Sequence, residues 1–165
     1  MKLFLGLLTH NLLCIIIIGI VSGVLIAAIP AGLFKPSKHS SYNDFKFEQG
    51  GKFYERHFKI SLWKDKVPQF SKIVHRGFSK ESIVSLDKEY LMRFYLETIR
   101  AEFCHRILIL CAPVFYHLNS SDAWGIAFTI LFAAGNIPFI MIQRYNRPRI
   151  KKIMDLKLHK NKIVN

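Results

Sequence analysis

Polar residues beside an apolar stretch at residues 100–106 have the types and spacing of an acid–base pair. Glu102 precedes His105 by three residues and follows Thr98 by four, so a helix would place all three on one face. A carboxylate next to an imidazole orients the ring and stabilises its charged form, as a general base requires when it takes a proton from a hydroxyl. We therefore predict His105 as a general base oriented by Glu102. The alternative is an ion pair between helices or an anchor at a membrane interface.

A second polar group ends the last apolar stretch, in residues 135–149 (GNIPFIMIQRYNRPR). Asn136, Gln143 and Arg147 follow one another at offsets of seven and four and would share a helix face. Polar side chains at bilayer depth are costly unless partnered, and they usually mark function. The amides are predicted to hold a substrate hydroxyl or carbonyl, and bidentate phosphate contacts are predicted for Arg144, Arg147 and Arg149. Hydrogen bonding between helices, with arginines that only set membrane orientation, is the alternative.

Hydrophobic stretches that could position these residues divide the chain. Its 165 residues are 51% apolar yet carry a net charge of +13, and the basic residues lie between and after the apolar stretches. This segregation predicts one mainly α-helical, small integral membrane domain (residues 1–165) with about three membrane-embedded helices, at residues 3–29, 104–118 and 123–143. The first exceeds the roughly 20 residues that cross a bilayer, which favours a retained helix over a cleaved signal peptide. The second is short and contains Pro113, so it is expected either to cross or to be re-entrant.

Basic residues predict the orientation of these helices. Residues 35–100 are basic and rich in aromatic side chains, residues 144–165 form a basic tail, and the turn after Leu118 has no Lys or Arg. Because basic loops stay on the cytoplasmic side, we expect a multi-pass protein of the cell membrane with both basic segments and the site at the cytoplasmic face. Contact with anionic membrane lipids accounts for the charge. No nucleic-acid docking module is visible, so nucleic acid is not expected as a partner.

Local patterns predict the structure of the basic segment. The alternation in residues 45–48 (FKFE) predicts a short strand or an extended arm, and the glycine pair that follows predicts a break. Residues 52–63 would form a basic amphipathic helix with aromatics on one side, lying in the membrane interface; a small soluble subdomain is the alternative. The helix that carries Glu102 is expected to begin near Ile83, capped by Ser79 or Ser82.

Glycine and proline residues predict how the third membrane helix packs and ends. Gly135 would permit close approach of another helix. Pro138 would open the backbone hydrogen bonding around Asn136, and Pro148 would make Arg147 the end of the helix.

Cysteine and histidine show no metal-ligand spacing. Cys14, Cys104 and Cys111 fall in or beside apolar stretches and form neither a metal motif nor a disulfide framework. Cys104 is adjacent to His105 but would point elsewhere on a helix, which argues against a Cys–His nucleophile pair. We predict no metal and no bound cofactor.

The order of motifs along the chain resembles a known family, the glycosyl-4,4'-diaponeurosporenoate acyltransferases of bacterial C30 carotenoid (staphyloxanthin) biosynthesis. The resemblance covers most of the chain and rests on these residues: Ile29-Pro30, Phe45-Lys46-Phe47-Glu48, Gly51-Lys52-Phe53, Trp63-Lys64, Arg100-Ala101-Glu102 with His105, Asn136-Ile137-Pro138, and Gln143 to Arg149. The last motif is long and specific. Arg106 stands where the family pattern would place an aromatic residue.

The resemblance implies transfer of a fatty acyl group to the glucose C6 hydroxyl of a glycosylated carotenoid carboxylate. His105 and Glu102 would then activate that hydroxyl, while Asn136, Gln143 and Asn146 would hold the substrate or the oxyanion. The phosphates of an acyl-CoA donor would meet a basic set: Arg144, Arg147, Arg149, Lys52 and Lys64. An acyl-carrier donor is the other option. The remaining alternatives are another membrane transferase acting on an isoprenoid or glycolipid, and a non-catalytic membrane protein that binds lipid or a partner.

Overall fold

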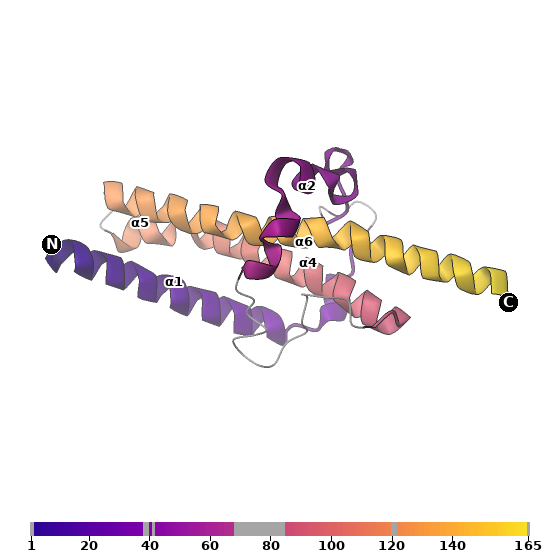
Figure 1. Cartoon of the computed structure of the whole chain (residues 1–165). Coiled ribbons are helices and arrows are strands. Elements are labelled where there is room, and N and C mark those ends of the chain that lie inside the picture. Colours follow the sequence, from indigo (N-terminus) through magenta and orange to yellow (C-terminus); the bar gives the residue numbers. More distant parts are fainter. Residues whose placement is uncertain (1, 38–39, 41, 68–84, 120–121, 165) are drawn as a thin grey trace. The chain divides into compact units, whose positions relative to one another are not determined.

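The computed structural model describes residues 2–37, 40, 42–67, 85–119 and 122–164, and within these ranges the regular structure is helical, without strands. The main helices are α1 (Lys2–Ala28), α2 (Lys52–Phe58), α4 (Lys88–Cys111), α5 (Val114–Leu118) and α6 (Ala123–Val164) (Figure 1). The described residues also form short 3₁₀ helices: η1 (Ala31–Phe34), η2 (Lys46–Gly51), η3 (Ile60–Leu62) and η4 (Lys64–Lys66). The chain divides into a first unit, Met1–Ile29 with Phe103–Ile140, and a second unit, Pro30–Glu102 with Met141–Asn165.

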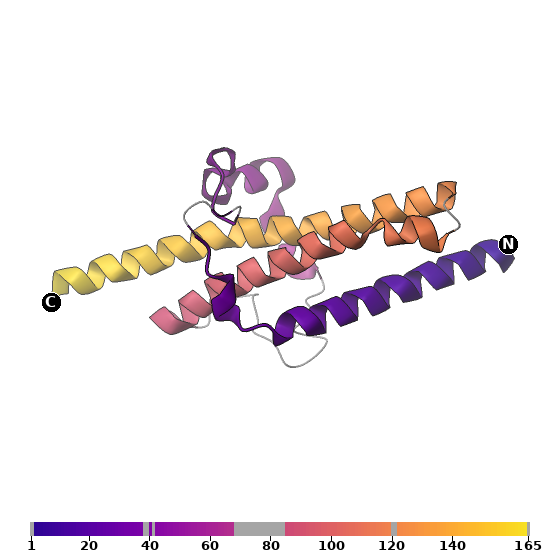
Figure 2. The same cartoon turned by 180° about the vertical axis from the view of Figure 1, so that it is seen from behind.

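The first unit packs α1 against the end of α4, α5 and the beginning of α6, which the two opposite views show side by side (Figure 2). Its core consists of Leu108, Ala112, Phe115, Phe128 and Phe132. From α1, a stripe at helical spacing covers that core: Leu7, Leu8, Cys14, Ile15 and Ile18. The other faces of α1 leave large apolar side chains exposed, among them Leu12, Leu13, Ile16 and Ile17.

A pair of amides joins α1 to the end of α5. Asn11 and Asn119 each donate a side-chain N–H to the other's carbonyl oxygen, at 2.8 and 2.9 Å. Each amide nitrogen also donates to a backbone carbonyl four residues earlier, that of Leu7 for Asn11 and that of Phe115 for Asn119. Both side chains are buried, 0% and 5% exposed, so the pair satisfies polar groups that would otherwise be stranded in an apolar core.

Two helices are long and apolar enough to cross a bilayer, within the described residues. They comprise Leu5–Ala28, with a mean hydropathy of 2.7, and Ala123–Lys157, with a mean hydropathy of 2.0. The expected middle span at residues 104–118 is divided between the end of α4 and the five-residue α5. Pro113 explains the division, because it has no N–H to continue the α4 ladder and instead precedes α5.

Helix α6, the predicted third membrane helix, differs from the prediction in how it packs and where it ends. A Cβ on Gly135 would meet nothing within 4 Å, so the expected close approach there is wrong. The close approach is at Gly125, where a Cβ would lie 2.8 Å from the Tyr116 carbonyl oxygen. The predicted end at Arg147 is also wrong, because α6 continues through Pro148 to Val164. Buried contacts on both sides of Pro148, from Arg147 and Ile150, offset the cost of its missing hydrogen bond, about 3 kcal/mol.

In the second unit, three elements of the basic segment differ from their predicted secondary structure. Residues 45–48 form no strand: Phe45 is extended, and η2 begins at Lys46 and reverses direction at residues 49–51, whose φ angles are 50°, 65° and 92°. The helix predicted at 52–63 ends at Phe58 because Lys59 is left-handed (φ 45°), and η3 follows. Helix α4 begins at Lys88, since residues 85–87 are not helical; Ser79, Ser82 and Ile83 lie outside the described residues.

Two clusters form the core of the second unit. One joins Tyr54 and Ile60 of the basic segment to Tyr145 of α6. The other joins Leu91 and Phe94 of α4 to Ile150 of α6, with flanking contacts from Tyr90, Tyr95, Ile153 and Met154. In this unit, residues 42–66 are held on the second part of α6, which also packs with the first part of α4 (Figure 1).

Candidate active site

In the first unit, His105 of α4 and Asn136 of α6 form a side-chain hydrogen bond that fixes the imidazole tautomer. The distance from His105 Nδ1 to Asn136 Oδ1 is 2.8 Å. Asn136 Nδ2 donates to the Phe132 carbonyl oxygen at 2.8 Å, and a carbonyl can only accept. The amide oxygen must therefore face His105, so Nδ1 carries the proton and Nε2 is the basic nitrogen of the neutral ring.

The ring of His105 is also held by an aromatic neighbour. Phe139 stacks on it with centroids 4.5 Å apart and planes 13° from parallel. Asn136 and Phe139 are three residues apart on α6 and so project from neighbouring points on one helix face. Asn136 is 7% exposed and His105 is half-buried, which keeps the hydrogen bond shielded while the imidazole stays accessible in part. A hydrogen-bonded, stacked and partly exposed imidazole has the geometry of a positioned general base.

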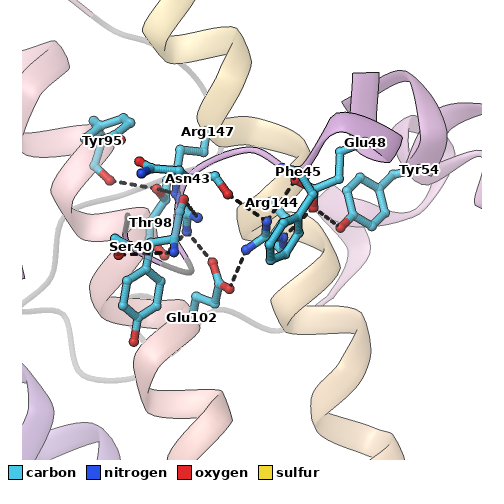
Figure 3. A network of polar contacts seen from close by, with 11 residues as sticks. Ser40, Asn43, Phe45, Glu48, Tyr54, Tyr95, Thr98, Glu102, Arg144 and Arg147 are labelled. Atoms are coloured by element: carbon cyan, nitrogen blue, oxygen red, sulfur yellow. Dashed lines mark hydrogen bonds and ion pairs between the residues drawn. The ribbon is translucent and has the colours of Figure 1, made fainter. Parts of the chain in front are cut away.

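In the second unit, two arginines and two glutamates form a buried network (Figure 3). Arg144 of α6 lies between two carboxylates. Its Nε and Nη2 donate to Glu48, the latter at 2.8 Å, and its Nη1 donates to Glu102 at 3.0 Å. Arg147 donates from Nη2 to the other Glu102 oxygen at 2.5 Å. The four groups balance in charge, and none is more than 6% exposed.

Backbone and hydroxyl acceptors complete the coordination of both arginines. Arg147 donates from Nε to the Thr98 hydroxyl at 3.1 Å and from Nη1 to the Tyr42 carbonyl at 2.8 Å. Arg144 donates to the Asn43 carbonyl at 3.1 Å, and its guanidinium lies 4.5 Å from the centre of the Phe45 ring. Residues 42–48 are therefore tied to α6 by charge-assisted bonds, which are the stronger kind.

Glu48 is the point where the basic segment enters this network. Its Oε2 accepts from the Phe45 N–H at 2.7 Å, and its Oε1 accepts from the Tyr54 hydroxyl at 2.5 Å. Burial alone would raise the pKa of Glu48, but the hydrogen bonds from Arg144, Tyr54 and Phe45 outweigh it, and the pKa lies below its ordinary value of 4.5. Burial, followed by the hydrogen bond to Glu48, raises the pKa of Tyr54, so the phenol stays protonated as a donor.

Both the His105–Asn136 pair and the arginine–glutamate network lie in the part of the chain that matches a known family. The model of the glycosyl-4,4'-diaponeurosporenoate acyltransferases matches residues 38–156. The chain belongs to this family. It is therefore an acyltransferase, and its two apolar helices are compatible with a membrane location.

Relatives named as glycosyl-4,4'-diaponeurosporenoate acyltransferases come from Staphylococcus aureus. The protein of strain MRSA252 is 31% identical over 127 residues, and that of strain bovine RF122 / ET3-1 is 30% identical over the same length. Each alignment covers 76% of this chain and 74% of the relative. The protein of strain N315 is 29% identical with the same coverage. No solved structure matches the chain.

The predicted site residues of this acyltransferase fall into separate groups. His105 and Asn136 are together in the first unit, whereas Glu102, Arg144 and Arg147 are together in the second, where arginines bind both Glu102 oxygens. Gln143 is 8% exposed, and its Oε1 has no hydrogen-bond partner in the described structure. Asn146 is half-buried.

Of the remaining basic residues of the predicted set, Lys52 and Arg149 are exposed and Lys64 is half-buried. Arg149 is exposed and donates to the Tyr145 hydroxyl at 2.6 Å, Lys64 pairs with Asp65 at 2.5 Å, and Lys52 is exposed at the start of α2. Among the described residues, no group of three or more His, Cys, Asp or Glu side chains could hold a metal ion.

Sequence reasoning missed Glu48 and Tyr54, which complete the network. Glu48 was noted only as part of an alternating pattern, and its partner Arg144 is 96 residues away. One local signal could have identified Glu48. It follows Phe45 by three residues, the spacing at which a glutamate near a helix start accepts a hydrogen bond from the backbone N–H of the capping residue. The pairing of His105 with Asn136 was also not predicted, although both residues were.

Proposed function

We propose that the protein esterifies the glucose C6 hydroxyl of a glycosylated C30 carotenoid carboxylate (glycosyl-4,4'-diaponeurosporenoate) with a fatty acyl group. Family membership supports the acyltransferase chemistry, and the names of the Staphylococcus aureus relatives support the choice of acceptor. Two bilayer-length helices suit an acceptor whose long apolar tail stays in the membrane while its sugar lies at the interface.

The observation that carries the proposed mechanism is the fixed tautomer of His105. Nε2 takes the proton of the sugar hydroxyl as the oxygen attacks the acyl thioester carbonyl. Asn136 Oδ1 accepts from Nδ1–H throughout, which stabilises the imidazolium that forms. Collapse of the tetrahedral intermediate breaks the carbon–sulfur bond, and the imidazolium returns its proton to the thiolate. Hydroxyl and thioester become ester and thiol, and the base is restored.

This mechanism gives Asn136 and Glu102 roles different from those predicted from sequence. Asn136 orients the base instead of binding the oxyanion, because both ends of its amide are engaged by His105 and the Phe132 carbonyl. Glu102 holds Arg144 and Arg147 in the second unit.

We also propose that the phosphates of an acyl-CoA donor contact exposed cations of the second unit. Lys52 and Arg149 have exposed side chains, whereas the guanidinium donors of Arg144 and Arg147 are directed to protein acceptors. We propose a multi-pass protein with both basic segments at the cytoplasmic face, where such a donor is found; the positive-inside rule supports this orientation.

Lipid mass spectrometry tests the function directly. Cells that make the glycosylated C30 carotenoid, with this chain expressed, should accumulate a species heavier by one fatty acyl group. His105→Ala should abolish it, and His117→Ala, which changes an exposed histidine of α5, should not. Absence of the new species from cells with confirmed membrane insertion would refute the acceptor. Product formation by His105→Ala would refute the base.

A further inference from the structure

An exposed aromatic surface covers the outer side of residues 45–62 in the second unit. It consists of Phe45, Phe47, Phe53, Phe58 and Leu62, which we call the aromatic cap. Phe45 stacks on Phe47 with centroids 5.6 Å apart, and Phe53 meets Phe47 at 5.3 Å and Phe58 at 6.1 Å. Four of the five side chains are 45–66% exposed. Contiguous exposed apolar patches are rare on soluble monomers and mark interaction sites.

The cap is exposed although a core of its own lies beneath it. Tyr54 and Ile60, from the same segment, are buried against α6, 6% and 0% exposed. Gly51 approaches α6 so closely that a Cβ there would lie 3.0 Å from the Tyr145 carbonyl oxygen. With Glu48 bound to Arg144, the segment is fixed on α6, and its aromatic side chains remain exposed in the folded protein.

Cationic side chains surround the cap. Five basic residues of the segment are exposed: Lys46, Lys52, Arg56, Lys59 and Lys66. Most acidic residues of the segment have partners. Glu48 is buried in the arginine network, Glu55 accepts from the Ser61 hydroxyl at 2.6 Å, and Asp65 pairs with Lys64. The surface therefore combines apolar side chains with accessible positive charge, the composition that suits anionic headgroups over acyl chains.

We propose that the aromatic cap inserts into the headgroup region of an anionic bilayer, with the neighbouring Lys46, Lys59, Lys66 and Arg56 on the lipid phosphates. The buried side of the same segment packs on Met141, Ile142 and Tyr145 of α6, inside the helix Ala123–Lys157 that is apolar enough to cross a membrane. An aromatic surface fixed to such a helix lies near a bilayer surface. The proposal rests on the membrane location of the proposed function, but on neither its acceptor nor its base.

Tryptophan quenching in reconstituted bilayers tests the proposal on the full chain. In a Trp63→Phe, Trp124→Phe background, Phe47→Trp places one reporter in the cap. Its emission should be blue-shifted and protected from iodide, and brominated phosphatidylglycerol should quench it at a lower mole fraction than brominated phosphatidylcholine. Removing Lys46 or Lys59 by glutamine substitution should reduce that preference by up to about fivefold per lysine, since a basic residue near an anionic surface contributes about 1 kcal/mol.

A second reporter controls for general proximity to lipid. Leu86→Trp, in the same background, occupies an exposed apolar position outside the cap and should show no preference for phosphatidylglycerol. Iodide access to the Phe47→Trp reporter in bilayers would overturn the proposal, as would equal quenching by the two lipids or a preference shared by Leu86→Trp. The assay contains no carotenoid or acyl donor, so its outcome is separate from that of the acyltransferase assay.

Discussion

Truncation of Asn136 tests the orienting hydrogen bond to His105. Asn136→Ala removes the 2.8 Å acceptor of Nδ1–H but leaves the imidazole and its Phe139 neighbour in place. A hydrogen bond to a charged group contributes about 1.5–3 kcal/mol. If that contribution is made mainly to the imidazolium in the transition state, kcat should fall about 10- to 150-fold, at about 1.36 kcal/mol per factor of ten. KM should change little, because the neutral ring of the ground state needs the bond less.

The assay is acyl transfer by purified membranes with saturating donor and varied acceptor. Thr129→Ala is the matched control, because it lies on the same helix and loses only a 2.8 Å bond to its own Gly125 carbonyl. His105→Ala sets the scale, with an expected loss of about 10²–10⁴-fold for a missing general base. An Asn136→Ala protein with unchanged kcat, or one in which only KM rises, would refute the assignment of Asn136 as the residue that orients the base.

Three further predictions concern the scaffold. Glu102→Ala strips the buried guanidinium groups of a shared carboxylate and should lower the free energy of unfolding by about 3–5 kcal/mol; a thermal midpoint in detergent equal to that of the parent would contradict this. Glu48 has a lowered pKa in the folded protein, so its contribution is complete above the ordinary value of 4.5 and is lost as the pH falls through the folded value. Unfolding midpoints measured from pH 7 downward should therefore drop less steeply for Glu48→Gln than for the parent, and parallel curves would refute the argument. Gly125→Ala should destabilise by about 1–3 kcal/mol through overpacking, whereas Gly135→Ala should not, and equal midpoints for the two variants would show that the close approach is absent.

Much of the helical architecture follows from local patterns in the sequence. The apolar runs that form α1 and the beginning of α6 are each long enough to predict a membrane-spanning helix. Pro113 marks the point where the middle apolar stretch divides into α4 and α5. Predictions of local structure from a few residues were wrong where a contact with a distant part of the chain determines the conformation. Four alternating residues predicted a strand at 45–48, but the carboxylate of Glu48 bonds locally to Phe45 and distantly to Arg144, which stabilises a turn instead.

For the candidate site, the sequence predicted which residues matter but not which residues they pair with. Asn136 was predicted because polar groups are expensive in apolar sequence, and His105 because of its helical spacing from Glu102; both arguments are local. Their pairing depends on the register of α4 against α6, which the sequence does not state. Pro148 was expected to end the helix by a rule about backbone hydrogen bonds. The rule was overridden by Arg147, whose guanidinium makes four hydrogen bonds to residues far from it along the chain.

The amide pair between Asn11 and Asn119 makes α1 more than an anchor. A helix held only by apolar packing can slide along its neighbours at small cost, because one branched side chain replaces another. Sliding α1 by one turn, about 5.4 Å, would leave two amides without partners in an apolar core. The two reciprocal hydrogen bonds thus fix the position of α1 along its axis relative to the end of α5. A generic hydrophobic helix spliced onto residue 30 would reach the membrane as readily, but it would have no fixed position there.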